Sequence, residues 1–506
     1  MKNSRFGHLR KPHSLPQLVL YVLPIVVLFY VLTCYTAIVV LERIPHVQDE
    51  VVYIWQAQVF RSGHLYLRSY PEGLRRFFDH EFIINNGKWY GTFCPGQSVF
   101  LAIGLLVGAP WLINPLFGSF SVVLLFYLGY RVYSMRTALL VSLLFAVSPF
   151  YIVMSASYMG HTPSLFFTLL AFVGMTEILM SMPRAVRKSW YMLVGFSLGV
   201  VFLIRPYNVL PSLVILAIVM LRRFLSLPKT SLATLLREIA AFSLPFALLA
   251  FLNLSYNRIV TDHWLVFPYT VYAPSVSIGF GMRGSEWGAP FTPADAIRNL
   301  SKNYRALKSH LLLWPSFYAV LIGALAFLGK RRLMSLLYLF FLILQITAYF
   351  FYFHPGTYMG PRYWFEATWI LVLLLAEGFV VLFSYVERML KSRVISLLYV
   401  LMTAVLISLN LLSDLSYLPL FRGYNGMTRI SLPNIQKPAL VFVSAVSNWQ
   451  AYGRFFIQQP ALFEKQDVIF ARDRALHNVP GRGDNPLPNQ MLIDYFPGRA
   501  VYYIGE

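Results

Sequence analysis

Eleven apolar stretches follow one another along this 506-residue chain. A helix needs roughly 20 apolar residues to cross the hydrocarbon core of a bilayer, and most of the stretches approach or exceed that length. The chain is 58% hydrophobic and only 12% charged, with a mean hydropathy of +0.60. We therefore predict an all-α polytopic membrane protein with about eleven transmembrane helices. The stretches lie near 18–41, 116–133, 137–156, 162–182, 189–204, 207–221, 239–258, 311–329, 333–353, 363–386 and 394–413.

The basic residues predict how these helices are oriented. If the N-terminus is cytoplasmic, every short basic loop falls on the cytoplasmic side, which is the positive-inside pattern of a plasma (inner) membrane protein. The first stretch, 18–41, is too long for a signal-peptide core and lacks a small-residue cleavage site, so we expect it to be retained. The net charge of +21 then reflects orientation signals, and we expect no nucleic-acid partner. The loops contain Arg131 and Arg136; Arg184, Arg187 and Lys188; Arg222 and Arg223; Lys330, Arg331 and Arg332; and Arg388, Lys391 and Arg393.

Two regions outside the predicted helices complete the domain organisation. The long loop 42–115 contains the apolar piece 97–113, which Gly108 and Pro110 interrupt, and we interpret that piece as an interfacial or re-entrant helix on the outer side. The tail 414–506 contains three short apolar runs separated by Pro- and Gly-rich turns, at 437–444, 467–470 and 500–504. We predict a transmembrane catalytic domain over 1–413 and a small extracytoplasmic α/β domain over 414–506.

The segment 42–51 directly follows the first apolar stretch and contains two adjacent carboxylates, Asp49 and Glu50. The segment 47–62 reads as a short helix on which Asp49, Tyr53 and Gln56 share one face. An ionised carboxylate at this point can accept a proton from an attacking hydroxyl, so both acids are candidate catalytic groups. The alternative is that they only complement the helix dipole at its N-terminus.

Six motifs carry a resemblance to a known family. The chain resembles the C-type (GT-C) superfamily of membrane glycosyltransferases over residues 15–385, in particular the bacterial branch similar to protein O-mannosyltransferases and aminoarabinose transferases. The resemblance implies an enzyme that transfers a sugar from a polyprenyl-phosphate carrier to an acceptor on the outer side of the membrane, with Asp49 as the catalytic carboxylate. The motifs are HVQDEVVYIWQAQVFRSGHL (46–65), KWYGTFCPGQSVFLAIG (88–104), SYMGHTPS (157–164), LIRPYN (203–208), SIGFGMRG (277–284) and GPRYWFEATWILVLLLAEG (360–378).

Two arginines are candidate ligands for the departing lipid phosphate. Arg205 and Arg362 lie at the outer ends of predicted helices, each beside a proline and each followed within two residues by a tyrosine, Tyr207 or Tyr363. The planar, multi-donor guanidinium suits phosphate. The alternative is that each arginine only extends to the membrane interface.

The other candidates are weaker. Substrate-binding roles are open to Tyr53, His161, Arg283, Tyr269 and His354, although a lone histidine such as His161 is more often structural. For Glu366 we expect pairing with Arg362, one helical turn away, and for Asp79, His80 and Glu81 we expect a solvated loop.

The leading hypothesis from the sequence is an inverting glycosyltransferase with a polyprenyl-phosphate sugar donor, in contact with membrane lipid. Its acceptor is a glycan, a lipid or a protein. The alternative is a secondary transporter or lipid flippase without covalent chemistry; a catalytically degenerate scaffold is a third reading. No nucleotide-binding or zinc-binding motif is present, and we assign no cofactor, although a divalent metal bridging Asp49 and the phosphate stays open.

Overall fold

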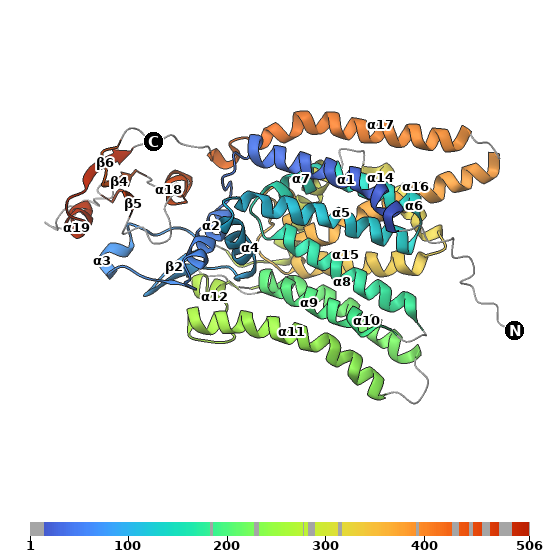
Figure 1. The fold of residues 1–506 in the computed structure, drawn as a ribbon, viewed down its shortest axis with the longest axis horizontal. Helices are drawn as coiled ribbons and strands as arrows, with labels where there is room; N and C mark the ends of the chain where they lie inside the picture. Colours follow the sequence, from blue (N-terminus) through green and yellow to red (C-terminus); the bar gives the residue numbers. More distant parts are fainter. Residues whose placement is uncertain are drawn as a thin grey trace.

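The computed structural model describes residues 15–182, 186–226, 232–276, 278–281, 289–311, 316–390, 394–427, 435–444, 449–457, 466–474 and 488–504. Long helices run side by side through most of the molecule, and a small sheet-containing part lies at one end of them (Figure 1). We call this the α2 end, because α2 (Gln48–Arg61) and α4 (Gly96–Leu106) also lie there.

In every apolar stretch predicted from the sequence the described residues are mainly helical, which confirms the polytopic all-α fold. Among the described residues, eight helices are long and apolar enough to cross a membrane alone. The bent pair α6–α7 makes a ninth, whereas α9, with 17 residues, and α14 with η5 are shorter than such a helix. The helices are α1 (Leu15–Tyr35) continued by η1 (Thr36–Val40), α5 (Ile113–Val132), α6 (Met135–Ala146), α7 (Pro149–Ala156), α8 (His161–Ser181), α9 (Lys188–Ile204), α10 (Val209–Ser226), α11 (Leu232–Thr261), α14 (Ser316–Ala324) with η5 (Leu325–Leu328), α15 (Arg332–Phe350), α16 (Phe365–Leu390) and α17 (Val394–Tyr417).

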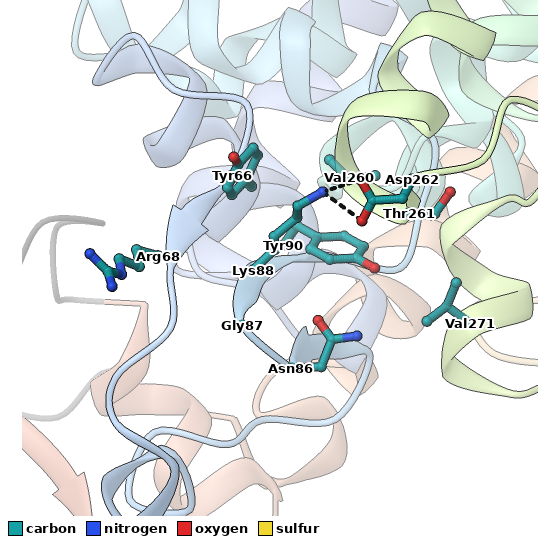
Figure 2. A pocket seen from close by; sticks show the side chains of 10 residues that line it. All are labelled: Tyr66, Arg68, Asn86, Gly87, Lys88, Tyr90, Val260, Thr261, Asp262 and Val271. Atoms are coloured by element: carbon teal, nitrogen blue, oxygen red, sulfur yellow. Dashed lines mark hydrogen bonds and ion pairs between the residues drawn. The ribbon is translucent and has the colours of Figure 1, made fainter.

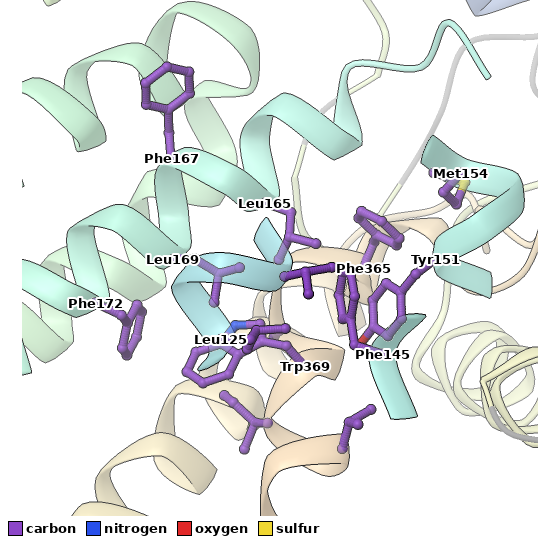
Figure 3. Packing of buried hydrophobic residues seen from close by; sticks show 14 of the residues in the cluster. Leu125, Phe145, Tyr151, Met154, Leu165, Phe167, Leu169, Phe172, Phe365 and Trp369 are labelled. Atoms are coloured by element: carbon purple, nitrogen blue, oxygen red, sulfur yellow. The ribbon is translucent and has the colours of Figure 1, made fainter. Parts of the chain in front are cut away.

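Aromatic contacts and close helix approaches hold the bundle together. Figure 3 shows Phe145, Tyr151 and Phe365 meeting in its interior, with the rings of Phe145 and Tyr151 stacked at 3.9 Å. Tyr151 follows the 59° bend between α6 and α7, where Pro149 cannot donate a backbone hydrogen bond. Elsewhere α9 and α11 touch so closely that a Cβ on Gly195 would stand 2.0 Å from the Phe242 carbonyl oxygen.

The loop 42–115 folds into short elements at the α2 end. Strands β1 (Leu67–Arg68), β2 (Ile83–Asn85) and β3 (Lys88–Gly91) form an antiparallel sheet in the order β1-β3-β2. Helix α4, with 11 residues, rises about 16 Å, which is too short to cross a bilayer. This agrees with the interpretation of 97–113 as an interfacial or re-entrant piece. The remaining elements are α3 (Glu72–Arg75) and η2 (Pro110–Leu112).

The C-terminal part contains the predicted strands. Strands β4 (Ala439–Val443), β5 (Val468–Arg472) and β6 (Ala500–Ile504) form a parallel sheet in the order β5-β4-β6, with the fully buried β4 at its centre. Helix α18 (Trp449–Phe456) lies between β4 and β5 in the sequence, and α19 (Pro488–Tyr495) lies between β5 and β6. The small α/β fold expected for the tail is therefore confirmed.

This C-terminal sheet shares one hydrophobic core with α2. Val51, Val52, Trp55 and Val59 on one face of α2 belong to the same buried cluster as all five residues of β4. The ring of Trp55 stacks on Phe456 of α18, with centroids 6.0 Å apart. The helix that carries Asp49 is therefore packed directly against the C-terminal part of the chain.

His80 lies in this interface, so the expected solvation is wrong for His80, whereas the neighbouring Glu81 is exposed as expected. Its ring stacks on Phe456 with centroids 5.2 Å apart, and its side chain is almost fully buried. The backbone N–H of Arg472 on β5 donates to the Phe77 carbonyl at 2.8 Å and closes the same interface. Adjacent polar residues suggested exposure, but contacts almost 400 residues away in sequence bury the histidine.

We predict that acidification weakens this interface through His80. Burial lowers the pKa of His80 to about 4, and the charge of Arg472 acts in the same direction. A histidine in the unfolded chain has a pKa near 6.5. The stability that depends on a neutral His80 is therefore complete above that pH and declines as the pH falls toward 4, by roughly 2 kcal/mol at about pH 5. Thermal unfolding between about pH 7 and pH 5 measures the loss.

The matched control is His80→Phe, which keeps the ring contact and cannot be protonated. Burial raises the pKa values of the neighbouring Asp79 and Glu81, whose contributions have the opposite sign but are common to both proteins. An identical pH dependence in the variant and the unaltered protein would contradict the assignment.

Candidate active site

The two adjacent acids at the start of α2 have different surroundings. Glu50 is buried, and its carboxylate accepts backbone N–H groups from His46 at 2.6 Å, Val47 at 3.3 Å and Tyr158 at 2.8 Å. Burial raises the pKa of the Glu50 carboxyl, and these three donors act against that shift. Asp49 keeps a side-chain exposure of 19%. Glu50 thus ties α2 to the turn before α8, and Asp49 is open to a ligand.

Asp49 meets Arg362 across 313 positions of sequence. Arg362 Nη1 donates to Asp49 Oδ2 at 3.2 Å. The arginine opens the 3₁₀ turn η6 (Arg362–Trp364), and its backbone N–H donates to the carbonyls of Gly356 and Gly360. Gly356 has φ +66°, and a Cβ there would stand 2.3 Å from the ring of Tyr363. The glycines of the 351–361 loop therefore allow the tight turn that directs Arg362 toward α2.

Arg205 pairs with Glu366, so the expected pairing of Glu366 with Arg362 is wrong. Arg205 Nε lies 3.3 Å from Glu366 Oε1, and both side chains are largely buried. Arg205 follows α9 where Pro206 starts the turn η3 (Pro206–Asn208), while Glu366 is the second residue of α16. Sequence proximity favoured Arg362, but the 3₁₀ turn directs that arginine away from its own helix.

Arg205 also organises His161 and an aromatic pair. Its Nη1 donates to His161 Nε2 at 2.8 Å and its Nη2 donates to the Tyr349 hydroxyl at 2.9 Å. Since an arginine only donates, Nε2 of His161 is unprotonated and its lone pair is occupied. Tyr363 stacks on Tyr349 at 4.7 Å with nearly parallel rings.

Tyr363 lies close to both cations of the site. Its ring centroid is 5.7 Å from the guanidinium carbon of Arg205 and 5.3 Å from that of Arg362, distances at which the ring faces attract cations. Tyr53 is buried against Phe93, and burial together with the charge of Asp49 raises the pKa of its hydroxyl. Tyr207 turns toward α15, where its hydroxyl donates to the Ala348 carbonyl at 2.7 Å.

A separate pocket of about 550 Å³ opens at the same end, between the β-sheet of the loop and the end of α11 (Figure 2). Lys88 spans it, donating to both carboxylate oxygens of Asp262 and to the Ile259 carbonyl. The lysine therefore joins β3 to α11, and the rings of Tyr66 and Tyr90 remain as pocket walls. None of the predicted site residues lines this pocket, whose walls are Tyr66, Arg68, Asn86, Gly87, Lys88, Tyr90, Val260, Thr261, Asp262 and Val271.

Comparison with solved structures identifies the fold. The crystal structure of ArnT from Cupriavidus metallidurans bound to undecaprenyl phosphate matches with a TM-score of 0.51 and 14% identity, over 97% of this chain and 90% of that chain. This chain has the GT-C fold. The oligosaccharyltransferase of Archaeoglobus fulgidus matches with a TM-score of 0.45 and 13% identity over 94% of this chain and 68% of that one. The Pmt1–Pmt2 protein O-mannosyltransferase complex of S. cerevisiae matches with a TM-score of 0.38 and 18% identity over 50% and 34%. No protein-family model matches the sequence, and a search of curated proteins finds no match.

Within this GT-C fold, the residues named from the sequence divide into two groups. Six of them come together at the α2 end: Asp49, Tyr53, His161, Arg205, Tyr363 and Arg362. Two others turn elsewhere, since Tyr207 points to α15 and Glu50 to backbone N–H groups. Arg283 lies outside the described residues. In the described part of the chain no three His, Cys, Asp or Glu side chains are placed to hold a metal ion.

The sequence reading missed Tyr349 and gave His354 little weight. Tyr349 lies at the end of an apolar stretch, where a tyrosine usually marks the membrane interface. Burial lowers the pKa of His354 to about 4, with the charge of Arg362 adding to the effect, so the ring is neutral near pH 7. The only feature of the sequence that points to a role for Tyr349 is its hydroxyl group, on a residue close to the start of the 351–361 loop.

We predict that Glu50→Gln destabilises the protein. The carboxylate of Glu50 is surrounded by three backbone N–H donors, and the NH₂ group of the introduced glutamine finds no hydrogen-bond acceptor among them. Leaving buried donors unpaired costs about 1–3 kcal/mol. Thermal unfolding in detergent measures the change. Glu72→Gln, at an exposed position of the same loop, is the control, and equal stability of the two variants would contradict the prediction.

Proposed function

We propose that this protein is a membrane glycosyltransferase that moves a sugar from a polyprenyl-phosphate donor to a glycan, lipid or protein acceptor outside the cytoplasm. The observation that carries the proposal is the meeting of a partly exposed Asp49 with Arg362, next to Arg205, at one end of a GT-C bundle. The likeness to an ArnT solved with undecaprenyl phosphate supports the choice of donor.

The proposed reaction is a single displacement with inversion. The acceptor O–H (or N–H) attacks the anomeric carbon while the bond from that carbon to the phosphate oxygen breaks. The leaving phosphate takes the electron pair, and Asp49 takes the acceptor proton. A phosphate is a good leaving group once cations neutralise its negative charge. The site therefore needs a base and cations rather than a strong acid.

The arginines supply those cations. Without donor, Arg362 is paired with Asp49 and Arg205 with Glu366. An incoming phosphate competes with Asp49 for Arg362, which releases the carboxylate to accept the acceptor proton. Glu366 stays with Arg205 and holds that guanidinium beside Tyr363. The donor thus helps to prepare the base.

The remaining residues have supporting roles in this proposal. Glu50 fixes the start of α2, so it positions Asp49 rather than reacting. Tyr53, His161 and Tyr363 form the walls around the phosphate. Tyr207, whose ring lies edge-on to Tyr349, supports that ring, and Arg283 belongs to the proposed substrate-binding set. We place the catalytic part in 1–413 and the extracytoplasmic domain in 414–506. The N-terminus is then cytoplasmic and the α2 end faces outward from the plasma (inner) membrane.

A transporter or flippase is the competing function. Transporters bind their substrate near mid-membrane between two related halves, whereas here the ionisable groups of the site gather where helices end. Detection of free polyprenyl phosphate together with a glycosylated product separates the two functions, because transport yields neither.

We predict that Asp49→Asn reduces transfer at least about a hundredfold, because the amide cannot accept the proton. The protein still folds and binds donor. The assay measures release of free polyprenyl phosphate in proteoliposomes supplied with lipid extract and envelope acceptor from the native cells. Asp494→Asn, an exposed acid in α19, should leave the rate unchanged. Full activity of Asp49→Asn rules out this carboxylate as the base.

We predict that Arg362→Lys raises the apparent donor KM by about tenfold or more. Lysine retains the charge but loses the planar donor fork, and charge-assisted hydrogen bonds of this kind are worth about 1.5–3 kcal/mol. Initial rates over a range of donor concentrations measure the effect. Arg422→Lys, exposed near the same end, is the control, and an unchanged donor KM in Arg362→Lys would refute the phosphate role.

A further inference from the structure

Helix α13 (Pro293–His310) carries two different exposed rows of side chains. Ile297, Leu300 and Tyr304 are spaced as one helical face and are 60%, 37% and 53% exposed. The second exposed row is basic and also has helical spacing: Arg298, Lys302 and Arg305. An exposed apolar row beside a basic row on an otherwise polar helix is the composition of a membrane-surface helix.

Two contacts hold α13 against the ends of membrane-spanning helices. In its second turn, Asn299 Nδ2 donates to the Phe353 carbonyl at 2.8 Å, three residues beyond the end of α15. At its last residue, the ring of His310 lies edge-on to Tyr417, the last residue of α17, at 5.6 Å. Both contacts are at the α2 end of the bundle.

These anchors fix the depth of α13. The two contact residues, Asn299 and His310, are about 16 Å apart along α13 and join it to two membrane-spanning helices at the same end, so the helix runs along the membrane boundary. The next described helix, α14, begins at Ser316, only six residues after His310, a span of at most about 20 Å. The exposed apolar row therefore lies at the height where hydrocarbon meets water.

The charge of the helix selects the kind of lipid. The helix contains four basic residues and a single acid: Arg298, Lys302, Arg305 and Lys308, and Asp295. That acid accepts from Thr292 in the helix cap and pairs with Arg298. Basic residues this close to a bilayer each attract anionic headgroups.

We propose that α13 is a binding surface for anionic phospholipids of the adjacent leaflet. Ile297, Leu300 and Tyr304 enter the headgroup region, and Arg298, Lys302 and Arg305 contact lipid phosphates. Through the Asn299–Phe353 bond, the bound membrane surface also steadies the 351–361 loop that ends at Arg362. The proposal stands independently of any sugar transfer.

Spin labels test the depth of the apolar row. Cys34 and Cys94 are first replaced by alanine, and single cysteines are introduced as Ile297→Cys, Tyr304→Cys and Ser309→Cys. In nanodiscs of equal parts phosphatidylglycerol and phosphatidylcholine, the labels at 297 and 304 should collide mainly with oxygen, which dissolves in lipid. The control label at 309, which continues the basic row, should collide mainly with a water-soluble nickel complex. Equal exposure of all three labels to the nickel complex would overturn the proposal.

Headgroup quenching tests the lipid preference. A bimane at Ser309→Cys should be quenched severalfold more by phosphatidylglycerol carrying a headgroup nitroxide than by the matching phosphatidylcholine. The triple change Arg298→Gln, Lys302→Gln and Arg305→Gln should abolish this difference. The control triple Lys330→Gln, Arg331→Gln and Arg332→Gln, at the other end of the bundle, should retain it. Equal quenching by the two lipids in the unaltered basic row would reject an anionic-lipid surface.

Discussion

The buried Glu50 carboxylate is the contact on which the geometry of this end of the molecule depends. It accepts three backbone N–H groups and so joins the start of α2 to Tyr158, just before α8. The opposite side of α2, through Trp55, is sealed by the C-terminal sheet and α18. With one side held by hydrogen bonds and the other by apolar burial, α2 has little freedom to move. Asp49, next to Glu50, is therefore presented toward Arg362 by a rigid element rather than by a loop.

Two ion pairs share this region, and their environment explains why both are present. Each arginine is largely buried, and a buried charge is costly unless a partner and further hydrogen bonds compensate it. Arg205 has three such partners, Glu366, His161 and Tyr349, whereas Arg362 has Asp49 and two aromatic rings. Arg205 thus has the larger number of polar side-chain partners. In the proposed reaction an anionic ligand separates Arg362 from Asp49, so the proposal gives different tasks to two arginines that look equivalent in the sequence.

The sequence predicts the elements well and their long-range pairings poorly. Apolar length located the eleven helical stretches, and short apolar runs between Pro- and Gly-rich turns located the three C-terminal strands, because these patterns are local. Loop charge, together with the family resemblance, indicated that Asp49 and both arginines lie at the same end of the helices. The sequence alone could not show that Glu366 pairs with Arg205, because this pairing depends on a 3₁₀ turn that directs Arg362 away from Glu366. Nor could the sequence predict that His80 is buried, because Phe456, the residue that covers it, lies far along the chain. Tyr349 was hidden for a third reason: as part of an apolar stretch it cannot be told from an interface aromatic.

The residues of the site share one structural position, the break at a helix end. Asp49 is the second residue of α2, Arg205 directly follows α9 beside Pro206, and Arg362 opens η6 after Pro361. Inside a bilayer the backbone must satisfy its own hydrogen bonds, so irregular turns and polar side chains gather where helices leave the hydrocarbon. At Arg205 the break follows α9 directly, where Pro206 cannot continue the hydrogen-bond pattern of that helix. Segments distant in sequence are thereby brought to the same depth, and a polar site at the membrane boundary follows from the way the helices end.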